Sequence, residues 1–64
     1  MTKYEMRTKA REITIAAGVK RGTAAFNRFR RIAEQLLTDG YLPRFVRFKL
    51  DELIIYKARQ RTRA

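Results

Sequence analysis

Apolar residues in the first part of the chain recur at spacings of four, three and four, the period of one helical face: Met6, Ala10, Ile13 and Ala17. Thr2 precedes this pattern and Glu5 follows three residues later, as in a capping box, while Gly18 is the residue type that ends helices. The pattern predicts a helix over residues 3–17. The β-branched run Ile13, Thr14 and Ile15 weakens the last turns, so a break near Arg11 into two shorter helices stays open.

The second part has a stronger helical pattern. One apolar stripe follows the spacing i, i+3, i+6, i+7, i+10 and i+11: Phe26, Phe29, Ile32, Ala33, Leu36 and Leu37. Thr23 is a good N-cap residue and Gly40 a good terminator, which predicts a helix from there to about residue 38. The opposite side of this helix is polar and carries Asn27, Arg28, Arg30, Arg31, Glu34 and Gln35.

The segment after the "DGYLPR" turn alternates apolar and basic residues. Val46, Phe48 and Leu50 alternate with Phe45, Arg47 and Lys49, which predicts a strand over residues 45–50. Asp51 then fits an N-cap, and Glu52 fits the first turn of a short final helix over residues 52–60. Because one strand cannot form a sheet, the segment either pairs with another strand or is merely extended.

The final helix is predicted to be apolar nearly all round, which is typical of a helix buried on more than one side. Its apolar residues are therefore assigned to a homodimer interface: Leu53, Ile54, Ile55 and Tyr56. The expected fold is mainly α, with a helix, a turn, a second helix, a short extended segment and a C-terminal helix. Residues 1–64 are expected to form one small domain, with flexible ends at 1–2 and 60–64.

Length and composition favour a partner. A chain of 64 residues with no cysteine and no histidine has neither disulfides nor common metal ligands to support a small core, which favours dimerisation. Sixteen Lys and Arg against six Asp and Glu give a formal charge of +10, so we expect a polyanionic partner. A hydrophobic content of 45% argues for a folded chain. No stretch resembles a transmembrane helix or a signal peptide, and we expect a cytoplasmic protein that does not bind membranes.

The sequence lacks the residue types that most often carry out catalysis, because it contains no histidine and no cysteine. The common general base and the strongest nucleophile are missing, and the carboxylates are scattered except for the adjacent pair Asp51 and Glu52, which fits a helix start better than an active site. No metal-ligand spacing is present, and Gly18 with Gly22 does not match a phosphate-binding loop. We therefore expect no catalytic residue, no metal and no cofactor.

The segment between the first two helices has the residue types of a helix-turn-helix. That motif needs small residues where the helices cross, a glycine to turn, an apolar residue to plug the core and polar residues at the start of the second helix. Ala16, Ala17, Gly18, Val19 and the run Lys20-Arg21-Gly22-Thr23 supply these in order. The predicted motif spans residues 10–38 and binds double-stranded DNA.

Two family resemblances support this interpretation. "IAAGVKRGTAAFNRF" resembles the turn and recognition-helix start of TetR-type helix-turn-helix regulators. "DGYLPRFVRF…DELIIYKAR" is similar to small MerR-like and phage excisionase-like proteins, in which a terminal helix follows a short helix-turn-helix. The resemblance implies a phage- or plasmid-type transcriptional regulator, such as a repressor, or a recombination accessory factor.

The resemblance and the distribution of basic residues together place the predicted DNA contacts. Bases would be contacted from the second helix by Thr23, Asn27, Arg28 and Arg31, since Asn suits adenine and Arg suits guanine. Phosphates would be contacted by Lys20, Arg21, Arg30, Arg44, Arg47 and Lys49.

Three alternatives remain open at this point. The strand and following helix resemble those of ribbon-helix-helix repressors, in which Phe45, Arg47 and Lys49 would face the bases. The aromatic residues Tyr41, Phe45 and Phe48, interleaved with basic ones, are also typical of stacking platforms that bind RNA or ribosomes, although Phe48 more simply fits a core position. A small basic inhibitor that docks through the "LIIY" turn on an acidic protein surface is the third class.

Overall fold

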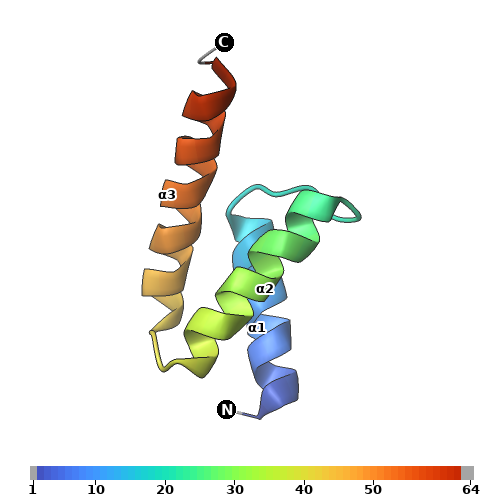
Figure 1. The fold of residues 1–64 in the computed structure, drawn as a ribbon. Helices are drawn as coiled ribbons and strands as arrows, with labels where there is room; N and C mark the ends of the chain where they lie inside the picture. Colours follow the sequence, from blue (N-terminus) through green and yellow to red (C-terminus); the bar gives the residue numbers. More distant parts are fainter. Residues whose placement is uncertain (1, 63–64) are drawn as a thin grey trace.

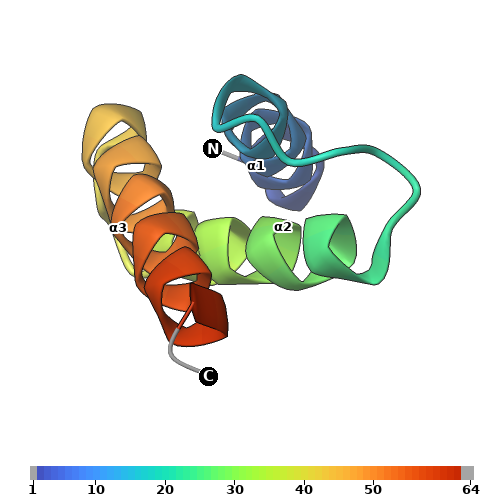
Figure 2. The ribbon, with the colours of Figure 1, turned by 90° about the horizontal axis from the view of Figure 1, so that it is seen from above.

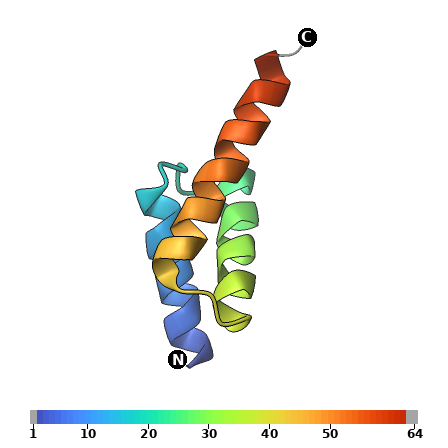
Figure 3. The same ribbon diagram turned by 90° about the vertical axis from the view of Figure 1, so that its left-hand side faces the viewer.

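The computed structural model describes residues 2–62, with side chains up to Gln60, and shows three helices over that range. They are α1 (Lys3–Ala16), α2 (Ala24–Thr38) and α3 (Pro43–Thr62). Helix α2 packs against α1 at an oblique angle and runs back in the opposite direction, and α3 crosses this pair with its last turns projecting beyond it (Figures 1 and 3). The mainly helical fold is as predicted, and residues 2–62 contain no strand.

Helix α1 begins at the predicted residue and ends at Ala16, one residue before the predicted end. The Thr2 Oγ1 accepts a hydrogen bond from the Glu5 N–H at 3.2 Å, which satisfies one free donor at the helix start. Gly18 has a φ of +88°, and its N–H donates to the Ile15 carbonyl at 3.0 Å, while the Val19 N–H reaches back to the Thr14 carbonyl at 3.3 Å. This pair of bonds is a Schellman motif, which turns the chain sharply out of the helix.

The β-branched run does not break α1. The helix is continuous through Arg11 because Ile13 and Thr14 are buried against the other helices, and packing outweighs the lower helix propensity of these residues. The Thr14 side chain is fully buried, and its hydroxyl donates to the Ala10 carbonyl at 2.7 Å. This polar side chain in the core is therefore hydrogen-bonded.

Helix α2 confirms its predicted stripe and its predicted ends. The Thr23 Oγ1 accepts a hydrogen bond from the Phe26 N–H at 3.1 Å, and Gly40 turns out of the helix with a φ of +98°. The stripe faces the core: Phe26, Phe29, Ala33 and Leu37 are buried, and Ile32 and Leu36 are partly buried.

The predicted strand over residues 45–50 is wrong, because this segment is the first half of α3. The helix starts at Pro43, whose missing N–H costs nothing at the first helical position, and the N–H groups of Phe45 and Val46 both donate to the Leu42 carbonyl at 3.0 Å. A lone strand would leave its backbone groups unpaired, whereas the helix satisfies them within the segment. The extended segment of the expected fold is therefore replaced by helix.

Asp51 is correspondingly not an N-cap. It lies inside α3, where both of its carboxylate oxygens are 3.2 Å from the Nε of Arg47, one helical turn earlier. The predicted short helix over residues 52–60 is the second half of the same long helix.

The core lies where the three helices meet. Val46 and Leu50 of α3 are fully buried, as are Ala10 of α1 and Ala33 of α2, and the two alanines let the helices approach closely. Because Val46 and Leu50 are four residues apart, they share one face of α3, while Phe48 between them is 56% exposed.

The view from above shows α3 on one side of α1 and α2, with the segment 17–23 looping over the far end of α2 (Figure 2). The predicted flexibility at the chain ends partly concerns Met1 and residues 63–64, which lie outside the described residues. Within residues 2–62, no helix combines the length and the apolar character needed to cross a membrane.

Candidate nucleic-acid interface

The outward face of α2 carries three of the residues predicted to contact bases. Asn27, Arg28 and Arg31 are all exposed, because they occupy the helix side opposite the buried stripe. None of the three takes part in an ion pair or side-chain hydrogen bond within the described part of the chain. Their polar groups are free to meet a ligand.

Two cations lie directly before this face, in the segment 17–23. Lys20 and Arg21 are exposed, while Val19 is half-buried and packs against the core. Gly22 has a φ of +77°, a conformation that glycine adopts without strain, and it brings the chain to the Thr23 cap. Anchoring on both sides thus holds Lys20 and Arg21 at the N-terminus of α2, where the helix dipole also favours an anion.

Thr23 has a structural role that limits its predicted contact with bases. Its hydroxyl donates to the Lys20 carbonyl at 2.8 Å and accepts from the Phe26 N–H at 3.1 Å. The single hydroxyl proton is therefore already used to close the turn. Thr23 positions the two cations before it.

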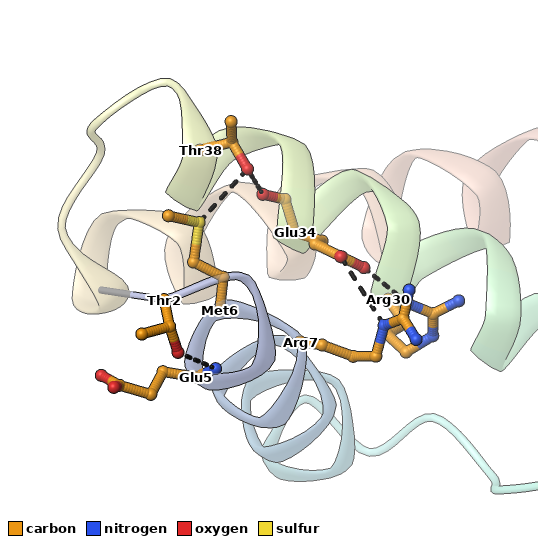
Figure 4. A network of polar contacts seen from close by, with 7 residues as sticks. All are labelled: Thr2, Glu5, Met6, Arg7, Arg30, Glu34 and Thr38. Carbon is orange, nitrogen blue, oxygen red and sulfur yellow. Dashed lines mark hydrogen bonds and ion pairs between the residues drawn. The ribbon is translucent and has the colours of Figure 1, made fainter.

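Arg30 points away from this face, toward α1. Its Nη1 donates to the Glu34 Oε2 at 2.7 Å, and the Arg7 Nε of α1 lies 3.7 Å from the other oxygen of the same carboxylate (Figure 4). The side chains of Arg30 and Glu34 are only 19% and 18% exposed. Nearby, the Thr38 hydroxyl donates to the Glu34 carbonyl at 2.8 Å and contacts the Met6 sulfur at 3.4 Å (Figure 4). Arg30 therefore joins two helices and does not extend the outward face.

The three cations predicted for phosphate contact in α3 also lie elsewhere. Arg44 and Arg47 line a shallow hollow between α3 and α1 together with Lys9 and Glu12, and Arg47 is paired with Asp51. The Lys49 Nζ lies 3.6 Å from the Glu52 carboxylate and 5.6 Å from the centre of the Phe45 ring. The structure does not bring these cations to the outward face of α2.

Two stretches without acidic residues do come together. The sequence has no Asp or Glu between Glu12 and Glu34, and none after Glu52. A hollow of about 690 Å³ lies between these stretches and is lined by Ala17, Gly18, Val19, Ala24, Ala25, Arg28 and Phe29 on one side and by Ile54, Lys57 and Ala58 on the other. The hollow therefore lies between two stretches that contain basic residues, such as Arg28 and Lys57, and no carboxylate.

Lys57 is the residue that the sequence-based prediction missed. Its Nζ lies 5.4 Å from the centre of the Phe29 ring, so α3 brings a cation to the hollow that Arg28 also lines. The sequence signal for it was the lack of acidic residues after Glu52. The C-terminal helix was interpreted only as a dimer interface, so this signal was not used.

The predicted dimer residues are divided between two faces of α3. Leu53 and Ile54 are half-buried and pack against the core, whereas Ile55 and Tyr56 are 54% and 59% exposed on the opposite side.

No group of three or more Asp, Glu, His or Cys side chains that could hold a metal ion occurs among the described residues. Comparisons with protein-family models, with curated proteins and with solved structures give no match to this chain.

Proposed function

We propose that this protein binds double-stranded DNA through the outward face of α2 and the two cations before it. The observation that carries the proposal is that the cations predicted to contact DNA form two groups, one without carboxylate partners among the described residues and one held in ion pairs. Lys20, Arg21, Arg28 and Arg31 are exposed and have no carboxylate partner within residues 2–60. Most of the other cations predicted to contact DNA are held in ion pairs: Arg30, Arg47 and Lys49.

Duplex DNA fits this face better than a single strand does. Single strands are bound chiefly by stacking bases on exposed aromatic rings. The aromatic residues of α2, Phe26 and Phe29, are buried, and the outward face carries only Asn27, Arg28, Arg31 and small or polar neighbours. A helix about 10–12 Å across fits a major groove about 12 Å wide, where Asn and Arg side chains recognise base edges.

In this proposal α1, the segment 17–23 and α2 act as a helix-turn-helix. Ala17 and Val19 pack against the core, which fixes the turn relative to both helices. Lys20 and Arg21 bind phosphates and set the position of α2, and the side chains of the outward face supply sequence preference. Such a domain serves a transcriptional regulator or a recombination accessory factor.

Fluorescence anisotropy with labelled duplex and single-stranded oligonucleotides over a salt series tests the proposal. We expect tighter binding to the duplex and a slope of log K against log salt of about −2 for the two cations assigned to phosphates, Lys20 and Arg21. Arg21→Gln should make that slope about one unit shallower. Lys3→Gln removes the same charge from the exposed start of α1 and should leave the slope unchanged.

An affinity that does not change with salt concentration contradicts the proposal. Equal affinities for duplex and single-stranded oligonucleotides also contradict it. Equal effects of Arg21→Gln and Lys3→Gln would show that net charge, rather than this face, determines binding.

A further inference from the structure

Helix α3 has a second apolar face that the described chain leaves largely exposed. Four large side chains lie on it, and we call them the α3 stripe: Phe45, Phe48, Ile55 and Tyr56. They are between 39% and 59% exposed, and the ring of Tyr41 stacks on Phe45 with ring centres 5.1 Å apart. The stripe faces away from Val46 and Leu50, which bury the other side of the same helix.

We propose that a second copy of this chain packs along the α3 stripe in an antiparallel arrangement. This inference concerns assembly and does not depend on the proposed binding of DNA. It modifies the interface predicted from the sequence: Ile55 and Tyr56 stay in it and Leu53 lines its hollow, whereas Ile54 packs against the core of one chain.

The exposed area is sufficient for a dimer. A buried aromatic side chain contributes about 150–250 Å², so the observed exposures leave roughly 500 Å² of the stripe and Tyr41 uncovered in each copy. Two copies would cover roughly 1,000 Å², which is the lower limit of a stable interface, before any flanking residue is counted. A chain this short also gains the core area that it lacks alone.

The shape of α3 sets the register. A hollow of about 440 Å³ is lined by Glu52, Leu53, Ile55, Tyr56 and Arg59, which follow the spacing of a hole that receives one side chain from a facing helix. A two-fold axis near residue 50 places Phe45 of the second copy in this hollow of the first copy. By symmetry, Phe45 of the first copy enters the same hollow of the second copy. The interface is thus self-complementary, as a two-fold dimer requires.

Charge agrees with the same register. Glu52 lies in the middle of the stripe and Lys49 at its edge, and the antiparallel arrangement brings Lys49 of each copy beside Glu52 of the other. The carboxylates of Asp51 and Glu52 at this point repel phosphates, which disfavours a nucleic acid strand on the exposed aromatic rings. A second copy therefore satisfies both the apolar and the charged residues of this face.

Sedimentation equilibrium over a range of concentrations tests the proposal. The wild-type chain should have twice its 7.6 kDa mass, and Lys49→Glu and Glu52→Lys should each raise the dimer dissociation constant about tenfold, because each homodimer then contains two like-charge contacts. Mixing the two variants should restore tight association, since every contact between positions 49 and 52 in the mixed dimer then joins opposite charges.

A matched control is present in α1. Lys9 and Glu12 form an ion pair with the same spacing, 3.5 Å long against 3.6 Å, on a similarly exposed surface. Lys9→Glu and Glu12→Lys change the net charge equally, and neither variant nor their mixture should alter the dissociation constant.

A wild-type mass of one chain at every concentration overturns the proposal. Dimerisation that the α3 variants leave unchanged, or a mixture no tighter than the single variants, also overturns it. Equal responses from the α1 pair would assign the effect to net charge and would likewise reject this interface. Circular dichroism of each variant verifies that the helices are intact.

Discussion

Arg30 donates a hydrogen bond to Glu34 at 2.7 Å, one helical turn further along α2, and this pair connects α2 to α1 because Glu34 also lies 3.7 Å from Arg7. Glu34→Gln keeps the shape of the side chain but removes its charge. We expect the free energy of unfolding to fall by about 1 kcal/mol, since the pair is mostly buried and shares one carboxylate between two cations. Urea denaturation measures the change.

The matched control for this prediction is Glu12→Gln, which breaks an exposed ion pair and should cost at most about 0.5 kcal/mol. Equal losses in the two variants would show that Glu34 does not join the helices.

Leu50→Ala tests the packing of α3 on the core. Leu50 is fully buried, so its truncation should cost about 2–5 kcal/mol and leave much of this small chain unfolded. Leu42 is 58% exposed, and Leu42→Ala should change the stability by no more than about 0.5 kcal/mol. Thermal melts followed by circular dichroism compare the two variants, and similar melting temperatures would contradict the burial of Leu50 in the core.

Thr14→Val tests whether the buried hydroxyl contributes to stability. The hydroxyl donates to the Ala10 carbonyl, which already accepts the helical hydrogen bond, so an apolar group of the same shape should be neutral or stabilising by up to about 1 kcal/mol. Thr14→Ser, which leaves a cavity where a methyl group was, should destabilise by about 1 kcal/mol. A large loss of stability on Thr14→Val in chemical denaturation would contradict this prediction.

Arg28→Ala tests the base contacts of the proposed interface. On a preferred site obtained by selection from random duplexes, the loss of affinity should be about 1–3 kcal/mol, with a much smaller loss on random duplexes. Arg44→Ala, on the side of α3 that faces α1, should weaken both kinds of duplex slightly and equally. Anisotropy titrations with the two probes measure the difference, and equal losses for Arg28→Ala on both would remove its role in sequence preference.

The sequence was sufficient for α1 and α2 because their signals are local. Thr2 and Thr23 cap the helices, Gly18 and Gly40 end them, and the exposed positions of the α2 face follow from the same periodicity. The pairing of Arg30 with Glu34 lies within α2 at a spacing of four residues, so the sequence contained this signal; only the contact of Glu34 with Arg7 depends on how α1 lies against α2.

The start of α3 was predicted as a strand because its apolar residues fit both the two-residue period of a strand and the spacing of a helix. Val46, Phe48 and Leu50 alternate as in a strand, but Val46 and Leu50 are also four apart, and Leu53, Ile54 and Lys57 continue the helical spacing. Pro43 at the first helical position and the lack of a partner strand both indicated a helix. Phe48 distinguishes the two periods, since only a helix turns it away from Val46 and Leu50.

Binding of duplex DNA to the outward face of α2 is tested by a ¹H–¹⁵N correlation spectrum of the labelled protein, recorded while duplex DNA is added. We expect the largest shifts on the backbone amides from Lys20 to Arg31, smaller changes near Lys57 and little change in the first turns of α1 or α3. Largest shifts between Pro43 and Asp51, or no shift on addition of excess duplex, would contradict binding at this face.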